Sequence, residues 1–315
     1  MSKISIIIPV YNAEKYVSAT LCCLQKQTFS DFEVLMINDG STDRSEVICK
    51  EFAAVDARFC CVSQENQGVS AARNNGLVLC RGEYVTFIDA DDMIPDDYLE
   101  KLYFALKDSL CSVSVCDVVV VDGGKETVRF TMEPQVLSRQ EALNCLLTRT
   151  SINSGPCAKL FKREILNGLA FPPLKAYEDI LFVVDAIDRC ERIAVTNKTE
   201  YRYIQNTGSA MSSFAKAPSK DIVAASEKLL DYIEKSPELD PRCFYITLSH
   251  LMQYVIPLVN QKTADAVAFV SAAKNVCRKY KRGIMKCSAF PWKEKIVYLL
   301  FAHGWLYRNK KMTRI

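Results

Sequence analysis

The first hundred residues alternate short apolar runs with segments of helical periodicity, and this alternation limits the possible folds more than any other feature. The runs ISIIIPVYN, FEVLMINDGS, RFCCVSQ and EYVTFID are short and mostly end in turn residues, which predicts strands. Between them, AEKYVSATLCCLQKQ, TDRSEVICKEFAA and NQGVSAARNNGLVLC have the composition and spacing of helices. Such alternation indicates an α/β fold, with a mostly parallel sheet flanked by helices.

Polar residues follow three of these predicted strands. The first, second and fourth strands end in PVYN, NDGS and DADD. Ligands of open α/β sheets bind beyond the carboxyl ends of the strands. We therefore expect these three strand ends to face one crevice.

The rest of the chain divides into two parts by its pattern. VVVVDGG predicts a further strand, and LSRQEALNCLLT predicts a helix capped by Ser138, with Glu141 completing a capping box. AKLFKREIL and EDILFVVDAIDRC predict helices, and RIAVTN and EYRYIQN predict short strands. Beyond about Pro218 the pattern predicts helices only. We expect an α/β domain at residues 1–217 and a helical C-terminal region at 218–315.

Cysteine usage and the start of the chain favour a cytoplasmic protein. The fourteen cysteines include no pair of CxxC units at zinc spacing. The apolar start is too short for a secretory signal and runs directly into a predicted strand. These features predict reduced thiols rather than a disulfide framework.

The charge of the chain is concentrated at its C-terminal end. Arg278–Ile315 holds eleven Lys or Arg and one acid, whereas the remainder carries a net charge of −7. Trp292 and Trp305 among these cations suit a helix lying at an anionic membrane surface. A terminal helix packed on the core, with a solvated basic face, explains the same pattern equally well. The apolar stretch of about a dozen residues is too short to span a bilayer.

The sequence FIDADD places like charges at the end of a hydrophobic strand. Asp89 and Asp91, separated by Ala90, can converge on Mg²⁺ or Mn²⁺, which favour carboxylate and water oxygens. The alternative is a solvated turn that caps the next helix. Asp96 and Asp97 fit the first turn of that helix, where negative charge is favourable.

Three further positions have a structural and a functional interpretation. Asp39 is either a turn residue or the acceptor for a ring N–H of a bound base. The helix with Gly68 and Ala71–Ala72 must approach something closely, and its Arg73 can pair with a phosphate or with the acids. Glu178-Asp179 is either a favourable helix start or a carboxylate that takes a proton from a substrate hydroxyl.

The order SIIIPVYN, INDGSTD, ENQGVSAARNNGL, FIDADD, AKLFKREIL and YEDILF resembles the family 2 glycosyltransferases of bacterial polysaccharide and lipopolysaccharide synthesis. These are inverting enzymes with the GT-A fold, the nucleotide-diphospho-sugar transferase fold. The resemblance covers about Lys3 to Ser213 and is poor in the helical tail. The chain departs from the pattern at Gln205-Asn206, where an arginine is common.

The resemblance implies a role for each matching residue. The donor nucleotide site would comprise Pro9, Val10, Tyr11, Glu14, Asp39, Gly68, Arg73, Asp89 and Ala90. Asp91 would hold a Mn or Mg divalent cation that bridges the donor diphosphate. Asp179 would be the catalytic base, and Asp92, Lys159 and Glu178 would border the donor or acceptor sugar.

The function implied is inverting transfer of a sugar from a nucleotide-diphosphate donor, with a UDP-sugar expected, to a hydroxyl of a glycan or lipid-linked acceptor. The enzyme would be cytoplasmic, or peripheral on the inner face of the plasma membrane. The alternative is a catalytically silent nucleotide-sugar-binding protein of the same fold. A nucleotidyltransferase is disfavoured because PVYNAEKY lacks a Gly-rich phosphate loop, and a dehydrogenase because no GxGxxG follows the first strand. No motif accompanies the basic tail to indicate nucleic-acid binding.

Overall fold

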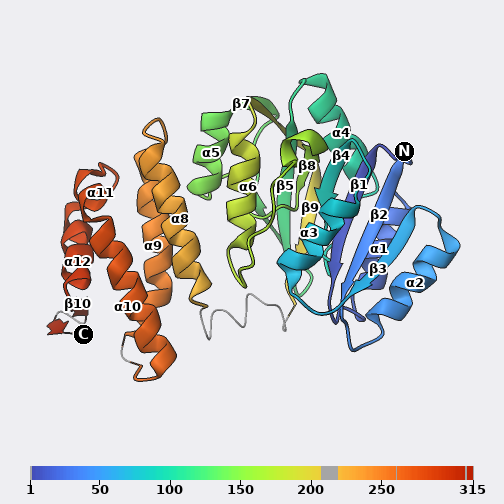
Figure 1. Cartoon of the computed structure of the whole chain (residues 1–315). Coiled ribbons are helices and arrows are strands. Elements are labelled where there is room, and N and C mark those ends of the chain that lie inside the picture. The colour runs from blue at the N-terminus through green and yellow to red at the C-terminus, as the bar shows by residue number, and fades with distance from the viewer. Residues whose placement is uncertain (1, 207–218, 260, 309–310, 315) are drawn as a thin grey trace. The chain divides into compact units, whose positions relative to one another are not determined.

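The chain forms two compact units, Met1–Thr207 (unit 1) and Gly208–Ile315 (unit 2). The computed structural model describes residues 2–206, 219–259, 261–308 and 311–314 (Figure 1). The boundary predicted between residues 217 and 218 lies outside the described residues.

Unit 1 is built on a nine-stranded mixed sheet. Its strands are β1 (Ile4–Val10), β2 (Phe32–Asp39), β3 (Phe59–Gln64), β4 (Tyr84–Phe87), β5 (Val113–Asp122), β6 (Lys125–Phe130), β7 (Gln135–Ser138), β8 (Lys159–Lys162) and β9 (Arg192–Ile204). The order is β3-β2-β1-β4-β8-β5-β9-β7, with β6 paired to β5. The four strands of the first hundred residues run parallel, as predicted, whereas β8 is antiparallel to both β4 and β5.

Helices connect and cover these strands. Those of unit 1 are α1 (Val17–Gln25), α2 (Ser45–Val55), α3 (Val69–Leu79), α4 (Tyr98–Asp108), α5 (Arg139–Leu147) and α6 (Glu178–Asp188), with a 3-10 turn η1 (Arg163–Leu166). Helix α3 packs on β1 and β2, and α4 packs on β5, β8 and β9. The predicted capping box of Ser138 and Glu141 opens α5 and is confirmed. The predicted α/β fold class is likewise confirmed.

The close approach predicted for α3 occurs at a different glycine from the one expected. At Gly76 an added Cβ would lie 2.4 Å from Cγ2 of Ile7 on β1, so only glycine lets the helix sit this near the sheet. Gly68 has open space around its Cα. It adopts φ +90°, a backbone conformation that L side chains rarely take, and it precedes α3. Gly68 is therefore required for its backbone conformation, and Gly76 for packing.

Two secondary-structure predictions were wrong in unit 1. AKLFKREIL was expected to be a helix, but Lys159–Lys162 is strand β8 and only Arg163–Leu166 coils. Here the open position between β4 and β5 decides the conformation, because KLFK completes the ladder hydrogen bonds of both strands. The two short strands expected in RIAVTN and EYRYIQN form the single strand β9. The exposed strands β6 and β7 were not predicted, because their sequences lack an apolar pattern.

Unit 2 is mostly helical, as predicted. Its elements are α8 (Asp221–Lys235), α9 (Pro241–Val255), the 3-10 turn η2 (Ile256–Leu258), α10 (Ala264–Lys279), α11 (Lys281–Lys286), α12 (Trp292–Ala302), β10 (Trp305–Arg308) and β11 (Lys311–Arg314). The expectation of helices only is wrong at the end of the chain, where β10 and β11 form an antiparallel hairpin. Among the described residues, no helix combines the length and the apolar character needed to cross a bilayer.

Candidate active site

The sheet brings the three polar strand ends to one edge, as predicted. Because β1 pairs in parallel with both β2 and β4, the carboxyl ends of these strands lie side by side. Val10 is opposite Asn38 in this register, and Ile7 is opposite Phe87. The loops that follow, with Tyr11, Gly40 and Asp89, therefore leave from the same edge of the sheet.

Asp39 ties the end of β2 to the start of α3. Its carboxylate is 2% exposed and accepts hydrogen bonds from the N–H groups of Gly68 at 2.8 Å and Gln67 at 2.9 Å. The side chain of Gln64 donates a third bond, at 2.8 Å. A carboxylate has about four acceptor positions, so one remains for the ring N–H of a base. The structure thus gives Asp39 a structural role and keeps its predicted binding role feasible.

The loop after β1 presents an exposed aromatic ring. Val10 is buried and Pro9 is half-buried, but the side chain of Tyr11 is 53% exposed. Asn12 adopts φ +48°, and its side chain accepts a hydrogen bond from the N–H of Thr42. These contacts hold the loop against the one that follows β2. The neighbouring Glu14 has the same function, since its carboxylate accepts from the N–H of Arg44.

Arg73 joins the end of β4 to the start of α6. Its Nη2 lies 2.9 Å from Oδ1 of Asp89, and its Nη1 lies 3.2 Å from Oε1 of Glu178. The arginine is 5% exposed, and its guanidinium lies over the ring of Phe171. The sequence left open whether Arg73 pairs with a phosphate or with the acids, and here it pairs with two acids. One buried cation therefore holds the DADD loop and the Glu178-Asp179 pair in one site.

The two remaining acids of DADD differ in environment. Asp91 is half-buried and accepts a hydrogen bond from the side-chain amide of Asn206 at 3.0 Å. Burial raises the pKa of Asp91, and the charge of Asp89 adds to this, while the bond from Asn206 opposes it. Asp92 is fully buried and accepts from the hydroxyl of Tyr201 at 2.6 Å and from the N–H of Ile204 at 2.9 Å.

These contacts give Asp92 a structural role and leave Asp91 accessible for the predicted cation. Asp92 anchors the loop to β9, so a contact between its carboxylate and a sugar would require the loop to rearrange. Ala90 is buried, and its carbonyl accepts from the hydroxyl of Thr20 on α1. Asn206, which orients Asp91, was not assigned a role from the sequence. The only signal in the sequence was that Gln205-Asn206 stands where an arginine is common in the family.

Glu178 and Asp179 begin α6, as predicted. Glu178 is buried, and burial together with the charge of Asp179 raises its pKa to about 7 despite the nearby Arg73. Burial also raises the pKa of Asp179, while the charges of Arg73 and Arg149 lower it. The Oδ1 atom of Asp179 accepts a hydrogen bond from the N–H of Ile180. Both carboxyls are therefore poised to hold protons at higher pH than ordinary carboxyls.

The backbone before α6 is strained. Tyr177 adopts φ +64°, a left-handed conformation that is unusual for a bulky residue, and the guanidinium of Arg149 lies 5.4 Å from its ring centre. Arg149 itself has φ +54°. Left-handed residues other than glycine cost free energy and tend to gather at functional sites. The strain here lies directly beside the carboxyl predicted to be the catalytic base.

Lys159 is a buried structural cation in this structure. It is fully inaccessible, and its Nζ donates to the carbonyls of Asn153 and Gly155 at 2.7 Å and to that of Cys157 at 3.3 Å. Burial lowers its pKa to about 8. The helix start predicted for this residue is wrong, and strand-end packing explains its position. Lys159 thereby shapes the segment at Gly155, where an added Cβ would lie 3.6 Å from Oδ2 of Asp179.

The site's donor set fits a Mg²⁺ or Mn²⁺ ion that is held largely by substrate. Among the described residues, no three His, Cys, Asp or Glu side chains form a metal-binding group. Magnesium is usually bound through one or two carboxylates together with water and substrate phosphates. The half-buried carboxylate of Asp91, beside that of Asp89, supplies such ligands.

Comparison with known proteins identifies the family. The sequence model described as "Glycosyl transferase family 2" matches residues 5–169, so the chain belongs to the family 2 glycosyltransferases. The chain is 33% identical over 216 residues to glycosyltransferase GlyA of Streptococcus pneumoniae, covering 66% of this chain but 31% of GlyA. It is 30% identical over 242 residues to GlyG of the same organism, covering 73% of this chain and 80% of GlyG. A poly(ribitol-phosphate) beta-glucosyltransferase of Bacillus spizizenii is 28% identical over 74% of this chain and 37% of its own.

Solved structures share the fold. Residues 1–349 of TarS from S. aureus, in complex with UDP-GlcNAc, superimpose with a TM-score of 0.78 at 21% identity, covering 99% of this chain and 96% of that one. A mannosyltransferase from Pyrobaculum calidifontis, in complex with GDP-Man and Mn²⁺, gives a TM-score of 0.54 at 17% identity, covering 96% of this chain and 86% of that one. These likenesses confirm the predicted GT-A fold.

Proposed function

We propose that this glycosyltransferase moves a sugar from a UDP-sugar to a hydroxyl of a cell-surface glycan or its lipid-linked precursor, with inversion at the anomeric carbon. The observation that carries the proposal is the buried bridge from Asp89 through Arg73 to Glu178. Through this bridge one side chain reaches both the end of β4, which we assign to the donor, and the helix start that bears a second carboxyl, Asp179. Donor and acceptor can therefore meet between them.

The donor side is supplied by the strand ends. We assign the exposed ring of Tyr11 to the base as a stacking surface, and the remaining acceptor position of Asp39 to a ring N–H. Pro9, Val10 and Gly68 shape this part of the site through the backbone, and Glu14 does so through its carboxylate, which accepts from the N–H of Arg44. The UDP-GlcNAc complex of TarS, which shares the fold, supports a uridine donor.

The acceptor side is supplied by α6. Asp179 takes the proton of the attacking hydroxyl, and its raised pKa makes it a better base than an ordinary carboxylate. Glu178, paired to Arg73, keeps the helix start fixed relative to the donor. Holding both substrates in a reactive geometry lowers the barrier further.

Asp91 would hold the divalent cation, with Asn206 fixing the orientation of its carboxylate. A bound Mn²⁺ or Mg²⁺ would neutralise the charge that develops on the departing diphosphate. The Mn²⁺ present with GDP-Man in the Pyrobaculum enzyme supports this assignment. The relative that acts on poly(ribitol-phosphate) supports a wall or surface polymer as acceptor. A location at the inner face of the plasma membrane stays a prediction.

The test is release of nucleoside diphosphate from a panel of UDP-, GDP- and TDP-sugars, with Mn²⁺ and polyol-phosphate or glycan acceptors. We expect one UDP-sugar to be consumed. Asp179→Asn should lower kcat by about 10²–10⁴-fold without weakening donor binding. Asp91→Asn should weaken donor binding only when metal is present.

A matched control is Asp96→Asn, because Asp96 is exposed and belongs to the same loop. It should leave both donor binding and turnover unchanged. If no donor releases nucleoside diphosphate, the transferase proposal is overturned. Donor binding without any release would favour the silent nucleotide-sugar-binding alternative.

A further inference from the structure

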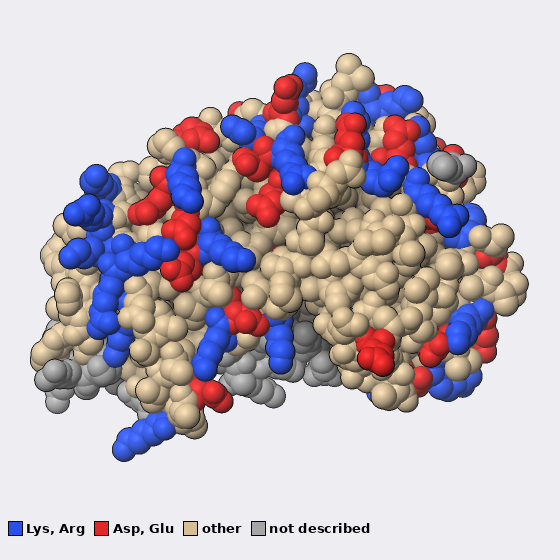
Figure 2. Space-filling view, viewed as in Figure 1, with Lys and Arg blue, Asp and Glu red and all other residues tan. Residues whose placement is uncertain are grey.

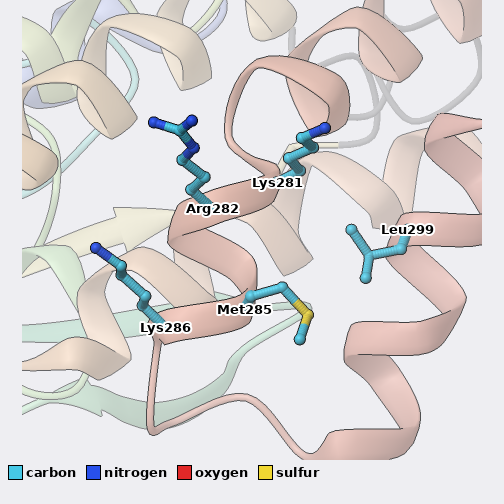
Figure 3. Close-up of a pocket in the computed structure, with 5 residues that line it drawn as sticks. All are labelled: Lys281, Arg282, Met285, Lys286 and Leu299. Carbon is cyan, nitrogen blue, oxygen red and sulfur yellow. The ribbon is translucent and has the colours of Figure 1, made fainter.

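The outer face of α11 and α12 in unit 2 combines exposed apolar side chains with unpaired cations. A pocket of about 320 Å³ lies there, lined by Lys281, Arg282, Met285, Lys286 and Leu299. Figure 3 shows Met285 directed toward Leu299 of the neighbouring helix, while Arg282 and Lys286 extend together from the other side of α11. Lys and Arg side chains gather at the left of Figure 2, where Figure 1 places these helices.

Helix α12 has two apolar faces, and one of them is turned outward. Tyr298, Phe301 and Ala302 are buried in unit 2. Trp292, Ile296 and Leu299 are spaced by four and three residues, so they share the other face of the helix. Trp292 is 67% exposed and Ile296 46%, and Met285 of α11 is 56% exposed. An indole, a thioether and a branched alkyl chain thus lie in water together.

The cations beside this face have no acidic partner among the residues that the structure describes. Within the described part of the chain, no acid pairs with Lys281, Arg282 or Lys286. Their neighbour Lys279 behaves differently, because its Nζ lies 2.8 Å from Glu227 and 3.0 Å from Asp231. Lys279 is therefore paired inside unit 2, whereas among the described residues the three cations of α11 pair with no acid.

The two helices are fixed to each other, so the face is preformed. The Nζ of Lys295 on α12 donates a hydrogen bond to the carbonyl of Met285 on α11, at 2.8 Å. Lys293 lies 5.7 Å from the ring centre of Trp292 and adds a further cation at its edge. Cations and apolar groups therefore occupy one surface.

We propose that this face, formed by Lys281, Arg282, Met285, Lys286, Trp292, Ile296 and Leu299, docks the protein on an anionic phospholipid bilayer. The headgroup region offers negative charge to the cations, and the boundary below it accepts Trp292, Ile296 and Met285. Tryptophan is favoured at that depth because its ring is amphipathic. The membrane contact expected from the sequence for the whole basic tail is thus limited to one face of α11 and α12. The proposed docking does not depend on the transfer reaction.

Other occupants fit less well. A second copy of the chain, docked face to face, would bring three unpaired cations against three like charges. A nucleic acid would pair with the cations but would leave the apolar side chains without a partner. A bilayer surface satisfies both kinds of group.

The test is co-sedimentation of the full chain with vesicles of phosphatidylcholine alone or mixed with phosphatidylglycerol. We expect binding to the mixed vesicles only, weakened by salt. The combined change Lys281→Gln, Arg282→Gln, Lys286→Gln should weaken binding on the order of 100-fold, because each surface cation contributes about fivefold. The matched control replaces three exposed lysines of unit 1, Lys26, Lys125 and Lys198, by Gln. It removes the same charge and should bind like the wild type.

A second measurement locates the contact. The chain has two tryptophans, so Trp305→Phe leaves Trp292 as the single indole, and its emission should shift to the blue on the mixed vesicles. Asp179→Asn should bind vesicles normally, which separates docking from catalysis. The proposal is overturned if the full chain ignores anionic vesicles, or if the α11 variant binds as well as the control. It is also overturned if the emission of Trp292 does not change when the protein binds vesicles. A wild-type dimer that becomes a monomer on the change Trp292→Ser would overturn it as well, because the face would then bind a second copy of the chain.

Discussion

The two units differ in the burial and pairing of their charged side chains. In unit 1 the candidate active site contains four charged residues that are less than 10% exposed and are hydrogen-bonded or ion-paired, namely Arg73, Asp92, Lys159 and Glu178. In unit 2 the cations of α11 are exposed and have no ionic partner among the described residues. Burial makes a charge costly unless its partners are fixed, so such charges hold a site rigid. Exposed charges are available to an external surface.

Burial separates the residues of unit 1 that we assign to substrate from those that hold the structure. In unit 1 the most buried ionisable groups hold the loops and helix starts in place, and we assign the half-buried Asp91 and Asp179 beside them to ligands. A residue's chemical type alone does not separate these roles. Asp91 and Asp92 are adjacent in the sequence and identical in chemistry, but one accepts from an amide at the site and the other anchors the loop to β9.

The largest effect should come from removing the buried cation. Arg73→Met leaves Asp89 and Glu178 without their shared partner in a poorly solvated position. We expect a loss of about 3–5 kcal/mol in the free energy of unfolding of unit 1, because breaking a buried ion pair leaves uncompensated charge. Urea denaturation followed by circular dichroism measures it.

Lys279→Met is the comparison in unit 2, because that lysine also joins two acids but at an exposed position. Its removal should change the unfolding transition little, since exposed ion pairs add little stability. Equal losses in the two variants would contradict the division between buried and exposed charges.

Part of this arrangement was predictable from the sequence. The alternation of apolar runs with helices predicted the parallel strands and the shared edge, because strand and helix periods are local properties. The sequence left open whether Arg73 pairs with a phosphate or with the acids. It could not decide, because Glu178 is 105 residues away in the chain. KLFK was misassigned because its conformation depends on an open position between two distant strands. The sequence could not predict which face of α12 is exposed, because the helix has two apolar faces and only the packing of unit 2 decides which one is buried.

A smaller effect is expected at Lys159, which tests whether a buried cation without an acidic partner also stabilises unit 1. Lys159→Met leaves three backbone carbonyls without their donor, and we expect a loss of about 1–3 kcal/mol near pH 7. The exposed Lys281→Met should stay within about 0.5 kcal/mol of the wild type.

The same lysine should produce a pH dependence. Its folded pKa of about 8 is below the ordinary value of 10.5, so between these values the unfolded chain binds more protons. Stability of the wild type should therefore gain a contribution as the pH rises from 8 to 10, and Lys159→Met should lose that gain. Denaturation at several pH values measures it. Parallel pH profiles for the two proteins would refute the buried-charge explanation.

The smallest effect should come from a half-buried charge at the edge of the site. Arg149 lies over the ring of Tyr177, and its charge lowers the pKa of Asp179. Arg149→Leu should therefore raise that pKa and move the acidic limb of the kcat profile to higher pH. Arg149→Lys keeps the charge but loses the planar contact with the ring, so its acidic limb should stay near that of the wild type. If both variants shift equally, the ring contact rather than the charge positions the base. If the acidic limb of the leucine variant does not shift, the pKa of Asp179 is set by the buried groups of unit 1 alone, and the half-buried charge of Arg149 has no part in it.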